Sequence, residues 1–337
     1  MSSKSRKFYT FILLPLFCLA VAVASLFLGR FPLAWTDFAQ LLRSFFDSKT
    51  VVSPQAATII LNIRLPRILS AFLIGGTLSL TGAAYQGLFR NPMVSPSILG
   101  VSSAAGFGAA LAILMALSSF WVQILSFLSG VGAIVIVYLI SLSTGRGHNK
   151  YLTLILSGMV VGAIFTALVS LLKYIADPYD TLPSIVYWLM GGLAGIELGE
   201  LKFLAVVTLC GGFILTISGW KLDLLSFGDD EARSMGVHVE YLRFLVIAVA
   251  TLMTAAAVCL SGIIGWIGLL VPHISRMLIG PKNSYLLPAS FFSGGAFLML
   301  VDDFSRAVSS MEIPLGITTS LIGAPFFIFI LLKTSKK

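Results

Sequence analysis

The sequence predicts an all-α polytopic membrane protein of about ten transmembrane helices, organised as a single transmembrane domain, 1–337. Three observations predict this class. Hydrophobic residues make up 58% of the chain and charged residues 11%, and the mean hydropathy is +0.99. A soluble fold of this length has no core large enough to bury so much apolar surface. The apolar residues also fall in runs near the roughly 20 residues of one membrane crossing, with charges at the ends of the runs.

The first apolar run, 8–28, follows three cationic residues, Lys4, Arg6 and Lys7. This pattern is typical of a signal peptide or of a first transmembrane helix. A signal peptide has an apolar core of about 7–15 residues, which is shorter than this run, and no polar start of a mature domain follows a cleavage site. We therefore expect a retained helix with its N-terminus in the cytoplasm.

Nine further spans are expected, separated by short polar or proline-containing breaks. In chain order they are 64–89, 97–117, 120–142, 151–175, 201–220, two spans within 242–276, 285–301 and 313–332. The run 242–276 is about twice as long as one crossing, so it needs a tight turn, expected at 261–265. The apolar piece 182–193 is too short to cross a hydrocarbon core of about 30 Å as a helix. We expect it to form a half-helix on the outer side, and 29–63 and 302–312 to be outer segments.

Small residues recur at four-residue spacing in two of the spans. One span contains Gly100, Ala104 and Gly108, and another contains Gly158 and Gly162. In lipid, close packing rather than the exclusion of water drives helices together, and small residues let backbones approach. These positions therefore predict close-packed helix faces.

Positive charges orient the predicted spans. Of the 22 lysines and arginines, 14 fall in segments that this topology places inside, as expected because cytoplasmic loops carry an excess of cations. Both termini and the short basic loop 143–150 are therefore expected on the cytoplasmic side of a multi-pass protein. The net charge of +8 follows from this distribution and does not indicate nucleic acid as a partner.

One polar segment, 221–241, stands between two long apolar runs. Its centre predicts a short helix: Gly228 and Asp229 can start it, acidic side chains favour the positive end of the helix dipole, and Gly236 can end it. A charged, capped helix cannot lie in lipid, so it must sit on an aqueous face. There it is either a solvated connector or a contact for a partner.

Four blocks of sequence resemble the FecCD-type permeases, the membrane subunits of ABC importers for iron–siderophore complexes, haem and cobalamin. The first is RLPRILSAFLIGGTLSLTGAAYQGLFRNPMVSPSILGVSSAAGFG, from Arg64. The others are YIADPYDTLPSIVYWLMGGLAG from Tyr174, GWIGLLVPHISRMLIG from Gly265 and IPLGITTSLIGAPFFIFILLK from Ile313. The resemblance implies the type II importer fold, with ten spans per subunit. It also implies a homo- or heterodimer of permeases around a central path, and an inverted pseudo-repeat that relates spans two to five to spans seven to ten.

The resemblance also assigns site residues. It implies that 221–241 is a coupling segment that docks on a separate ATP-binding subunit, present in two copies. The expected coupling residues are Gly228, Asp229, Asp230, Glu231, Ala232, Arg233, Met235 and Gly236. The residues expected to dock an extracytoplasmic substrate-binding protein are Arg64, Arg67 and Arg306. Anchoring at lipid headgroups is the alternative role for these arginines. A cytoplasmic gate is expected near Ser143 and Thr144, with ordinary helix-end polar residues as the alternative.

The sequence lacks the residues that competing functions need. No G-x-x-x-x-G-K-[ST] motif occurs, so the chain is not expected to hydrolyse ATP. An ion-coupled secondary transporter usually needs ionisable side chains inside the bilayer, but the carboxylates fall in loops or at span ends. An intramembrane enzyme needs a buried catalytic set, and His273 has no nearby carboxylate in sequence. Cys18, Cys210 and Cys259 share no metal-ligand spacing, and no cofactor is expected.

The expected function is therefore the translocation subunit of an ABC importer in a bacterial plasma (inner) membrane. A binding protein delivers the cargo outside, and ATP-driven closure of the partner subunits rearranges the helices that line the path. An iron–siderophore complex is the leading expected cargo because it is the largest class in that family. Haem and cobalamin are the alternative cargoes, and an ion-coupled secondary transporter is the alternative function.

Overall fold

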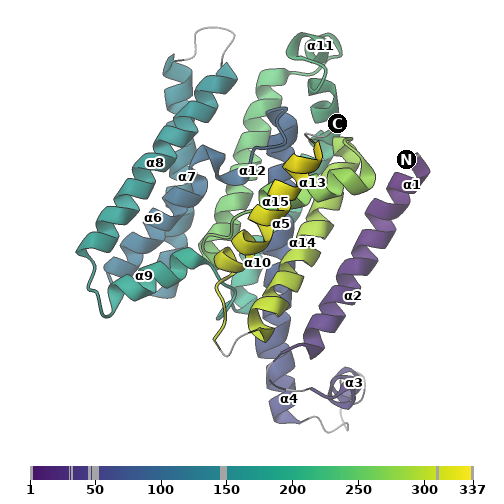
Figure 1. Ribbon diagram of the computed structural model, residues 1–337, viewed down its shortest axis with the longest axis vertical. Coiled ribbons are helices and arrows are strands. Elements are labelled where there is room, and N and C mark those ends of the chain that lie inside the picture. The colour runs from purple at the N-terminus through teal and green to yellow at the C-terminus, as the bar shows by residue number, and fades with distance from the viewer. Residues whose placement is uncertain are drawn as a thin grey trace.

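A computed structural model describes residues 3–29, 31, 33–44, 47, 53–144, 150–308 and 311–334. Every regular element in these residues is a helix (Figure 1). The predicted all-α fold is confirmed. The predicted basic loop 143–150 lies mostly outside the described residues, since 145–149 are not among them.

The helices form an elongated bundle, and most of them run along its long axis (Figure 1). In chain order they are α1 Ser3–Phe8, η1 Tyr9–Leu13, α2 Leu14–Phe27, α3 Trp35–Ser44, α4 Pro54–Thr58, η2 Ile59–Arg64, α5 Leu65–Leu88, η3 Pro96–Leu99, α6 Val101–Leu114, α7 Ser119–Thr144, α8 Lys150–Ile175, α9 Thr181–Met190, α10 Leu198–Leu225, α11 Asp229–Ser234, α12 Val239–Ser261, α13 Ile267–Ile279, α14 Asn283–Ala307 and α15 Leu315–Thr334. The elements η1 and η2 are short π-helical stretches within longer helices, and η3 is a 3₁₀ turn.

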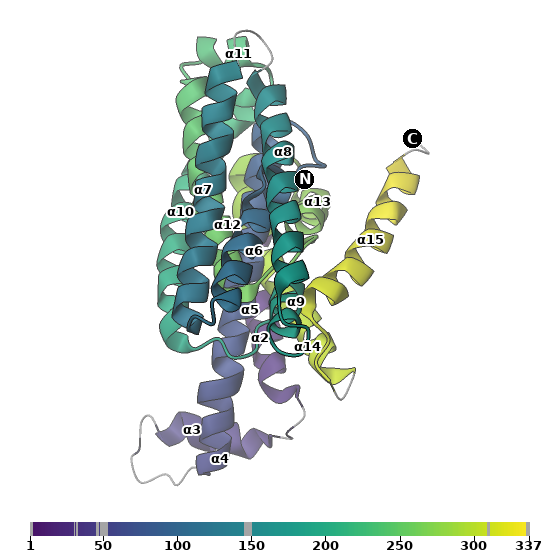
Figure 2. The same cartoon turned by 90° about the vertical axis from the view of Figure 1, so that its left-hand side faces the viewer.

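The two ends of the bundle carry different elements. The short helix α11 lies at one end, and α3 and α4 lie at the other (Figures 1 and 2). We call these the α11 end and the α4 end. Both α1 and the last turns of α15 lie toward the α11 end (Figure 1). The two described terminal helices therefore point to the same side of the bundle.

The ten predicted spans each correspond to a helix in the described part of the chain. Seven of these helices are long and apolar enough to cross a membrane by length and composition: Ser5–Phe27, Pro54–Leu88, Ser119–Ser143, Leu152–Ile175, Leu198–Leu225, Val239–Ser261 and Asn283–Ala307. Four shorter apolar helices accompany them: Val101–Leu114, Thr181–Met190, Ile267–Ile279 and Leu315–Phe329. Three of the shorter helices match predicted spans, and α9 matches the predicted half-helix 182–193.

Two predicted boundaries are wrong. The helix expected to start at residue 64 begins at Pro54 and continues through η2 into α5, so Arg64 lies ten residues inside it. The segment 29–63 is accordingly not a loop, because it contains α3, α4 and most of η2. At the other boundary, α14 extends to Ala307, whereas the sequence predicted an outer segment from 302 onward. Both errors placed helical residues in loops at the α4 end.

The directions of α5 and α12 agree with two inverted halves. The helix that contains α5 starts at the α4 end and runs toward the α11 end (Figure 1). α12 starts beside α11 and runs the opposite way, to Ser261. The backbone then turns at 262–266, where a turn was predicted, before α13 begins. The first helix of each predicted half therefore enters from an opposite end.

Glycines bring α5 very close to α13 and α14. Gly75 faces Gly294 of α14, and Gly82 faces Gly268 of α13. A Cβ atom built on Gly75 or Gly82 would overlap the carbonyl oxygen of the facing glycine. These contacts place α5 at the centre of the bundle, and small residues at such sites are what close packing in lipid requires.

We predict that Gly82→Val destabilises the protein, because the valine side chain would overlap the backbone of Gly268. Overpacking of this kind costs about 1–3 kcal/mol, and more where backbone cannot move. The matched control is Gly132→Val on α7, where a Cβ atom meets nothing within 4 Å. The midpoint of thermal unfolding of the purified protein should fall for Gly82→Val only. Equal midpoints for the two variants would contradict the packing argument.

Candidate functional site

The short helix α11 forms where the sequence predicted it. It spans Asp229–Ser234, with Gly228 before it and acidic residues in its first turn. Gly228 has a φ of 135° and Gly236 a φ of 85°, conformations that favour glycine. Ala232 is fully buried and belongs to the main apolar cluster. α11 is therefore a folded element seated on the bundle through one apolar side chain.

Asp229 fastens α11 to two other parts of the fold. Its Oδ2 accepts a hydrogen bond from Arg243 of α12 at 2.6 Å, and its Oδ1 lies 3.4 Å from Nη2 of Arg90, which follows α5. The side chains of Asp229 and Arg243 are both mostly covered. A carboxylate shared by two guanidiniums fixes the position of α11 relative to α5 and α12.

The remaining charges of α11 face solvent. The Asp230 side chain is 92% exposed and pairs with Arg233 at 3.0 Å. Arg233 also donates to Glu240 at 2.6 Å, and this hydrogen bond raises the pKa of the guanidinium. Glu231 and Met235 are exposed as well. Among the predicted coupling residues, Ala232 is therefore buried and Asp229 anchors the helix. The other charged residues form an exposed face.

Asp223 forms a second connection at this end, which the sequence did not single out. It lies in the last turn of α10 and accepts hydrogen bonds from the first residues of α14. Its Oδ1 accepts from the backbone N–H of Asn283 at 2.6 Å, and its Oδ2 accepts from the Ser284 hydroxyl at 3.0 Å. A carboxylate is favoured at the positive end of a helix. The segment that leads into α11 is thus tied to the start of α14.

Arg64 is turned inward at the α4 end. The residue is 4% exposed, and its guanidinium donates to the backbone carbonyls of Leu26 and Phe31. The sequence predicted an exposed arginine at this position. The inward orientation follows from the unpredicted helical turns before residue 64, which place the side chain against the end of α2. In the single chain, Arg64 joins α2 to η2.

Arg67 and Arg306 belong to one ion-pair cluster with buried carboxylates. Arg67 binds Asp302 through two nitrogens at 2.9 Å, and it also reaches Glu312, in the segment between α14 and α15, at 2.9 Å. Arg306 lies 3.1 Å from Asp302 and also pairs with Asp303. The Asp302 side chain is 3% exposed. These guanidiniums are largely covered in the single chain, so the docking role stays a prediction.

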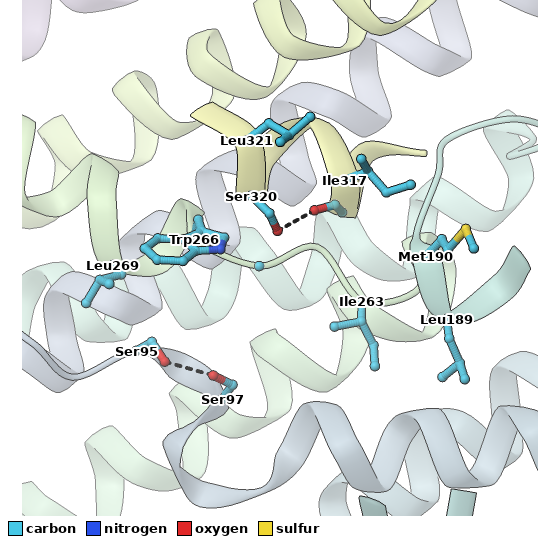
Figure 3. A pocket seen from close by; sticks show the side chains of 12 residues that line it. Ser95, Ser97, Leu189, Met190, Ile263, Trp266, Leu269, Ile317, Ser320 and Leu321 are labelled. Atoms are coloured by element: carbon cyan, nitrogen blue, oxygen red, sulfur yellow. Dashed lines mark hydrogen bonds between the residues drawn. The ribbon is translucent and has the colours of Figure 1, made fainter. Parts of the chain in front are cut away.

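A hollow of about 650 Å³ opens on the side of α9 and α15 (Figure 3). It was not predicted, because its walls come from distant parts of the sequence. Its lining residues are Ser95, Ser97, Leu189, Met190, Ile263, Gly265, Trp266, Leu269, Gly316, Ile317, Ser320 and Leu321. The hydroxyl oxygens of Ser95 and Ser97 are hydrogen-bonded at 2.8 Å, and the Ser320 hydroxyl donates to the Gly316 carbonyl at 2.6 Å. The wall is apolar with a few hydroxyls, and none of these twelve described residues carries a charged side chain.

Trp266 connects two walls of this hollow. It precedes α13 with a φ of 68°, a left-handed conformation that is strained for a bulky residue. A Cβ atom on Gly323 of α15 would meet the Trp266 ring at 2.8 Å, so the ring packs on the α15 backbone. The position of α15 is therefore coupled to the strained turn between α12 and α13.

The predicted gate residues lie at the end of α7. Ser143 is exposed, and its hydroxyl donates to the Ile140 carbonyl at 2.9 Å. Thr144 is the last residue of α7. The loop that follows is outside the described residues, so the gate stays a prediction.

These features define a class of protein. The multiple apolar helices make it a multi-pass membrane protein. The glycine-packed bundle, the charged helix seated across one end and the hollow on one side are features that a transport permease would need.

The chain belongs to the FecCD transport family, whose model matches residues 16–333. This confirms the resemblance found in the four sequence blocks. The chain is thus the permease subunit of an ABC importer and not an enzyme, and ATP hydrolysis takes place on a separate subunit.

Relatives of known name differ in what they carry. The molybdate import system permease protein MolB of Haemophilus influenzae is 42% identical over 315 residues, covering 93% of this chain and 92% of that protein. The cobalamin import system permease protein BtuC of Halobacterium salinarum is 40% identical, and the match covers 82% of this chain and 74% of that protein. The hemin transport system permease protein HmuU of Yersinia pestis is 36% identical, and the match covers 81% of this chain and 83% of that protein.

A solved structure shares the fold. It is an inward-facing ABC transporter assigned to the metal-chelate type, with a TM-score of 0.85 and 41% identity. The match covers 95% of this chain and 97% of that one. The predicted type II importer fold is confirmed.

We predict that Asp229→Asn loosens α11 from the bundle, since the amide keeps the size of the side chain but loses its charge for Arg243 and Arg90. Hydrogen bonds to charged groups contribute about 1.5–3 kcal/mol, so the opening free energy of α11 should fall by about that amount. Asp230→Asn is the control, because its side chain is exposed and substitutions at such sites usually change stability by less than about 0.5 kcal/mol. Hydrogen–deuterium exchange of the α11 amides separates the two variants, and equal exchange would refute the anchoring role.

We predict that Asp302→Ala destabilises the α4 end by about 3 kcal/mol, the lower part of the range for breaking a buried ion pair. The expected loss of stability lies in the lower part of that range because, in the variant, Arg67 still pairs with Glu312 and Arg306 still pairs with Asp303. Glu312→Ala serves as the control, since that side chain is 35% exposed and exposed pairs contribute at most about 1 kcal/mol. Thermal unfolding of the purified variants gives the comparison, and a larger loss for Glu312→Ala would reverse the ranking.

Proposed function

We propose that this permease imports an iron–siderophore complex across a bacterial plasma (inner) membrane. In this proposal a soluble extracytoplasmic binding protein delivers the complex at the α4 end. Two copies of an ATP-binding subunit act at the α11 end, and a second permease subunit, identical or related, completes the path. Haem and cobalamin remain alternative cargoes of the same chemical class.

The hollow of Figure 3 supports a cargo of this size. Its volume of about 650 Å³ lies within the roughly 300–1,000 Å³ typical of small-molecule sites. Hydroxyls of Ser95, Ser97 and Ser320 stand on an otherwise apolar wall. A transport path must hold its cargo weakly enough to release it. A wall of scattered hydroxyls without charge gives a large chelate such weak contacts.

The helix beside the hollow supports a second permease subunit on this side. α15 stands away from the bundle (Figure 2), and Leu321, Ile328 and Phe329 on it are 70%, 57% and 61% exposed. Leu321 also lines the hollow. Because the hollow is open on this side, a second subunit placed against α15 would close it into a path.

Molybdate is a second candidate cargo. The observation that favours it is the 42% identity with a molybdate permease over nearly the whole of both chains. A small oxyanion would also pass a wall that lacks carboxylates, because no like charge repels it. The two cargoes differ in size and chemistry, so one experiment separates them.

The charge distribution supports placing the α11 end in the cytoplasm. α1 and the end of α15 lie toward this end (Figure 1), and the N-terminal residues Arg6 and Lys7 are basic. Cytoplasmic segments carry the excess of Lys and Arg. Both termini would then be cytoplasmic, and the binding protein would dock at the α4 end. There Arg67 and Arg306 shape the docking surface by holding Glu312 and the end of α14.

The contacts of α11 support its role in coupling. Its exposed face carries Asp230, Glu231 and Arg233 for an ATPase groove, while Asp229 connects it to α5 and α12. Asp223 connects the preceding segment to α14. A displacement of α11 by the ATPase would therefore reach three long helices, which converts closure of the ATPase into movement of the path.

Uptake by cells that carry or lack the chain tests the cargo. Cells are given radiolabelled iron as a siderophore complex, haem, cobalamin or radiolabelled molybdate, each in a separate assay. Deletion should abolish uptake of the iron–siderophore complex, and expression of the chain from a plasmid should restore it. Loss of molybdate uptake alone would select the second candidate and reject the first.

We predict that triple replacement of Asp230, Glu231 and Arg233 by alanine uncouples transport. The exposed face of α11 would lose its charges, each contact being worth about 1–3 kcal/mol if desolvated by the partner, so co-purification of the ATPase and cargo uptake should both fall. The control is triple alanine replacement of Asp177, Tyr179 and Asp180, exposed residues between α8 and α9, which should leave co-purification of the ATPase unchanged. Unchanged uptake and association in the α11 variant would refute the assignment.

A further inference from the structure

Two hollows follow one another along α7, and together we call them the groove. The first lies between α7, the start of α10 and the end of α12, and the second lies between α7 and α12, so α12 forms the floor of both. The first, of about 620 Å³, is lined by Phe120, Gln123, Ile124, Phe127, Leu128, Gly199, Glu200, Phe203, Cys259 and Leu260. The second, of about 360 Å³, is lined by Val131, Ile134, Val135, Tyr138, Leu139, Phe244, Ile247, Ala248, Thr251 and Leu252. Figure 2 shows α7 and α10 on the side of the bundle away from α15.

The length of the groove matches the bilayer. From Phe120 to Leu139 the axis of α7 rises about 28 Å at 1.5 Å per residue, close to the hydrocarbon thickness of about 30 Å. Phe120 and Trp121 at the start of α7 are exposed, and aromatic residues at such positions mark the membrane–water interface. The first hollow therefore begins at headgroup level and continues into the acyl region.

One carboxylate, Glu200, stands at the headgroup end of the first hollow, and apart from Gln123 the other side chains that line it are apolar. Glu200, in the first turn of α10, accepts from Gln123 Nε2 at 2.5 Å and from the backbone N–H of Glu197 at 3.1 Å. Within the described residues, no ion pair involves Glu200 or Glu197. Each carboxylate oxygen can accept more than one hydrogen bond. Glu200 thus keeps acceptor capacity and a carboxylate that forms no ion pair within the part of the chain that the structure describes.

We propose that the first hollow is a binding site for a phospholipid with a primary-amine headgroup, of the phosphatidylethanolamine type. The ammonium donates to Glu200, and one acyl chain lies along Ile124, Phe127 and Leu128 over the α12 floor. Charge complementarity at the head and apolar contact along the tail select this lipid over an anionic one. The site lies apart from the hollow of Figure 3, so the inference does not depend on the cargo.

The chain offers a matched pair of glycine substitutions for the test. Gly199 lines the first hollow, and a Cβ atom there meets nothing within 4 Å. Gly199→Leu therefore places a larger apolar side chain in the site from a position where its Cβ atom has room. Gly132 on α7 has the same open surroundings and lines neither hollow. Gly132→Leu is the control for the added side chain.

Native mass spectrometry tests the site on the full-length permease purified with its co-expressed partner subunits. The probes are phosphatidylethanolamine and phosphatidylglycerol with identical acyl chains, added after delipidation. The unmodified protein should bind the ethanolamine lipid about tenfold more tightly, as expected for one additional charge-assisted hydrogen bond. Glu200→Gln, which keeps an oxygen for the Glu197 N–H, should abolish that preference and leave glycerol-lipid binding unchanged or stronger.

The glycine pair separates the site from the rest of the lipid-facing surface. Gly199→Leu should weaken binding of both lipids about tenfold, whereas Gly132→Leu should weaken neither. Equal binding of the two headgroups by the unmodified protein would overturn the proposal, as would an unchanged preference in Glu200→Gln. A change in the number of permease copies in Gly199→Leu would assign the groove to a subunit interface and would also overturn it.

Discussion

An aspartate shared between two arginines fastens α5 at both of its ends. At the α11 end, Asp229 lies between Arg243 and Arg90, the latter just after α5. At the α4 end, Asp302 lies between Arg306 and Arg67, the latter in the first turn of α5. An unpaired charge is costly in the hydrocarbon layer of a membrane. Arginines at the two ends of a membrane-spanning helix are therefore stabilised by a carboxylate partner. Through Asp229, α5 is connected to α12 at one end, and through Asp302 it is connected to α14 at the other.

The glycine contacts between these two clusters make α5 the rigid centre of the bundle. Facing glycines bring its backbone against α13 and α14, where interiors pack tightly and do not deform continuously. A displacement that reaches α5 through Asp229 is therefore transmitted along it. α15 is different, because it packs on α9, α13 and α14 and exposes much of its apolar surface. The fold thus combines a closely packed centre with a side helix that exposes much of its apolar surface.

Local signals in the sequence were enough for some elements and not for others. α11 was predictable because Gly228, the following acidic residues and Gly236 form a complete helix start and stop within nine residues. The half-helix α9 was predictable from its length alone. The end of α14 was not, because Asp302 and Asp303 look like loop residues until Arg67, 235 positions from Asp302 along the chain, neutralises the first of them. The helical turns before Arg64 were missed because residues 54–63 contain polar residues between the apolar ones, and these turns place Arg64 inward.

The burial of the α4-end arginines changes the docking role that we propose for them. An exposed arginine contributes its own charge to a partner, and the effect is mainly on encounter rate. In the proposed docking mode, a covered arginine would act through the carboxylate it holds, so the group presented to the binding protein would include Glu312, shortly before α15. Because Arg67 binds both Glu312 and Asp302, a partner that draws Glu312 outward would loosen the connection between α14 and α15. Contact at the α4 end would then act on α15, the helix that lines the hollow, while α5 stays fastened through Asp302.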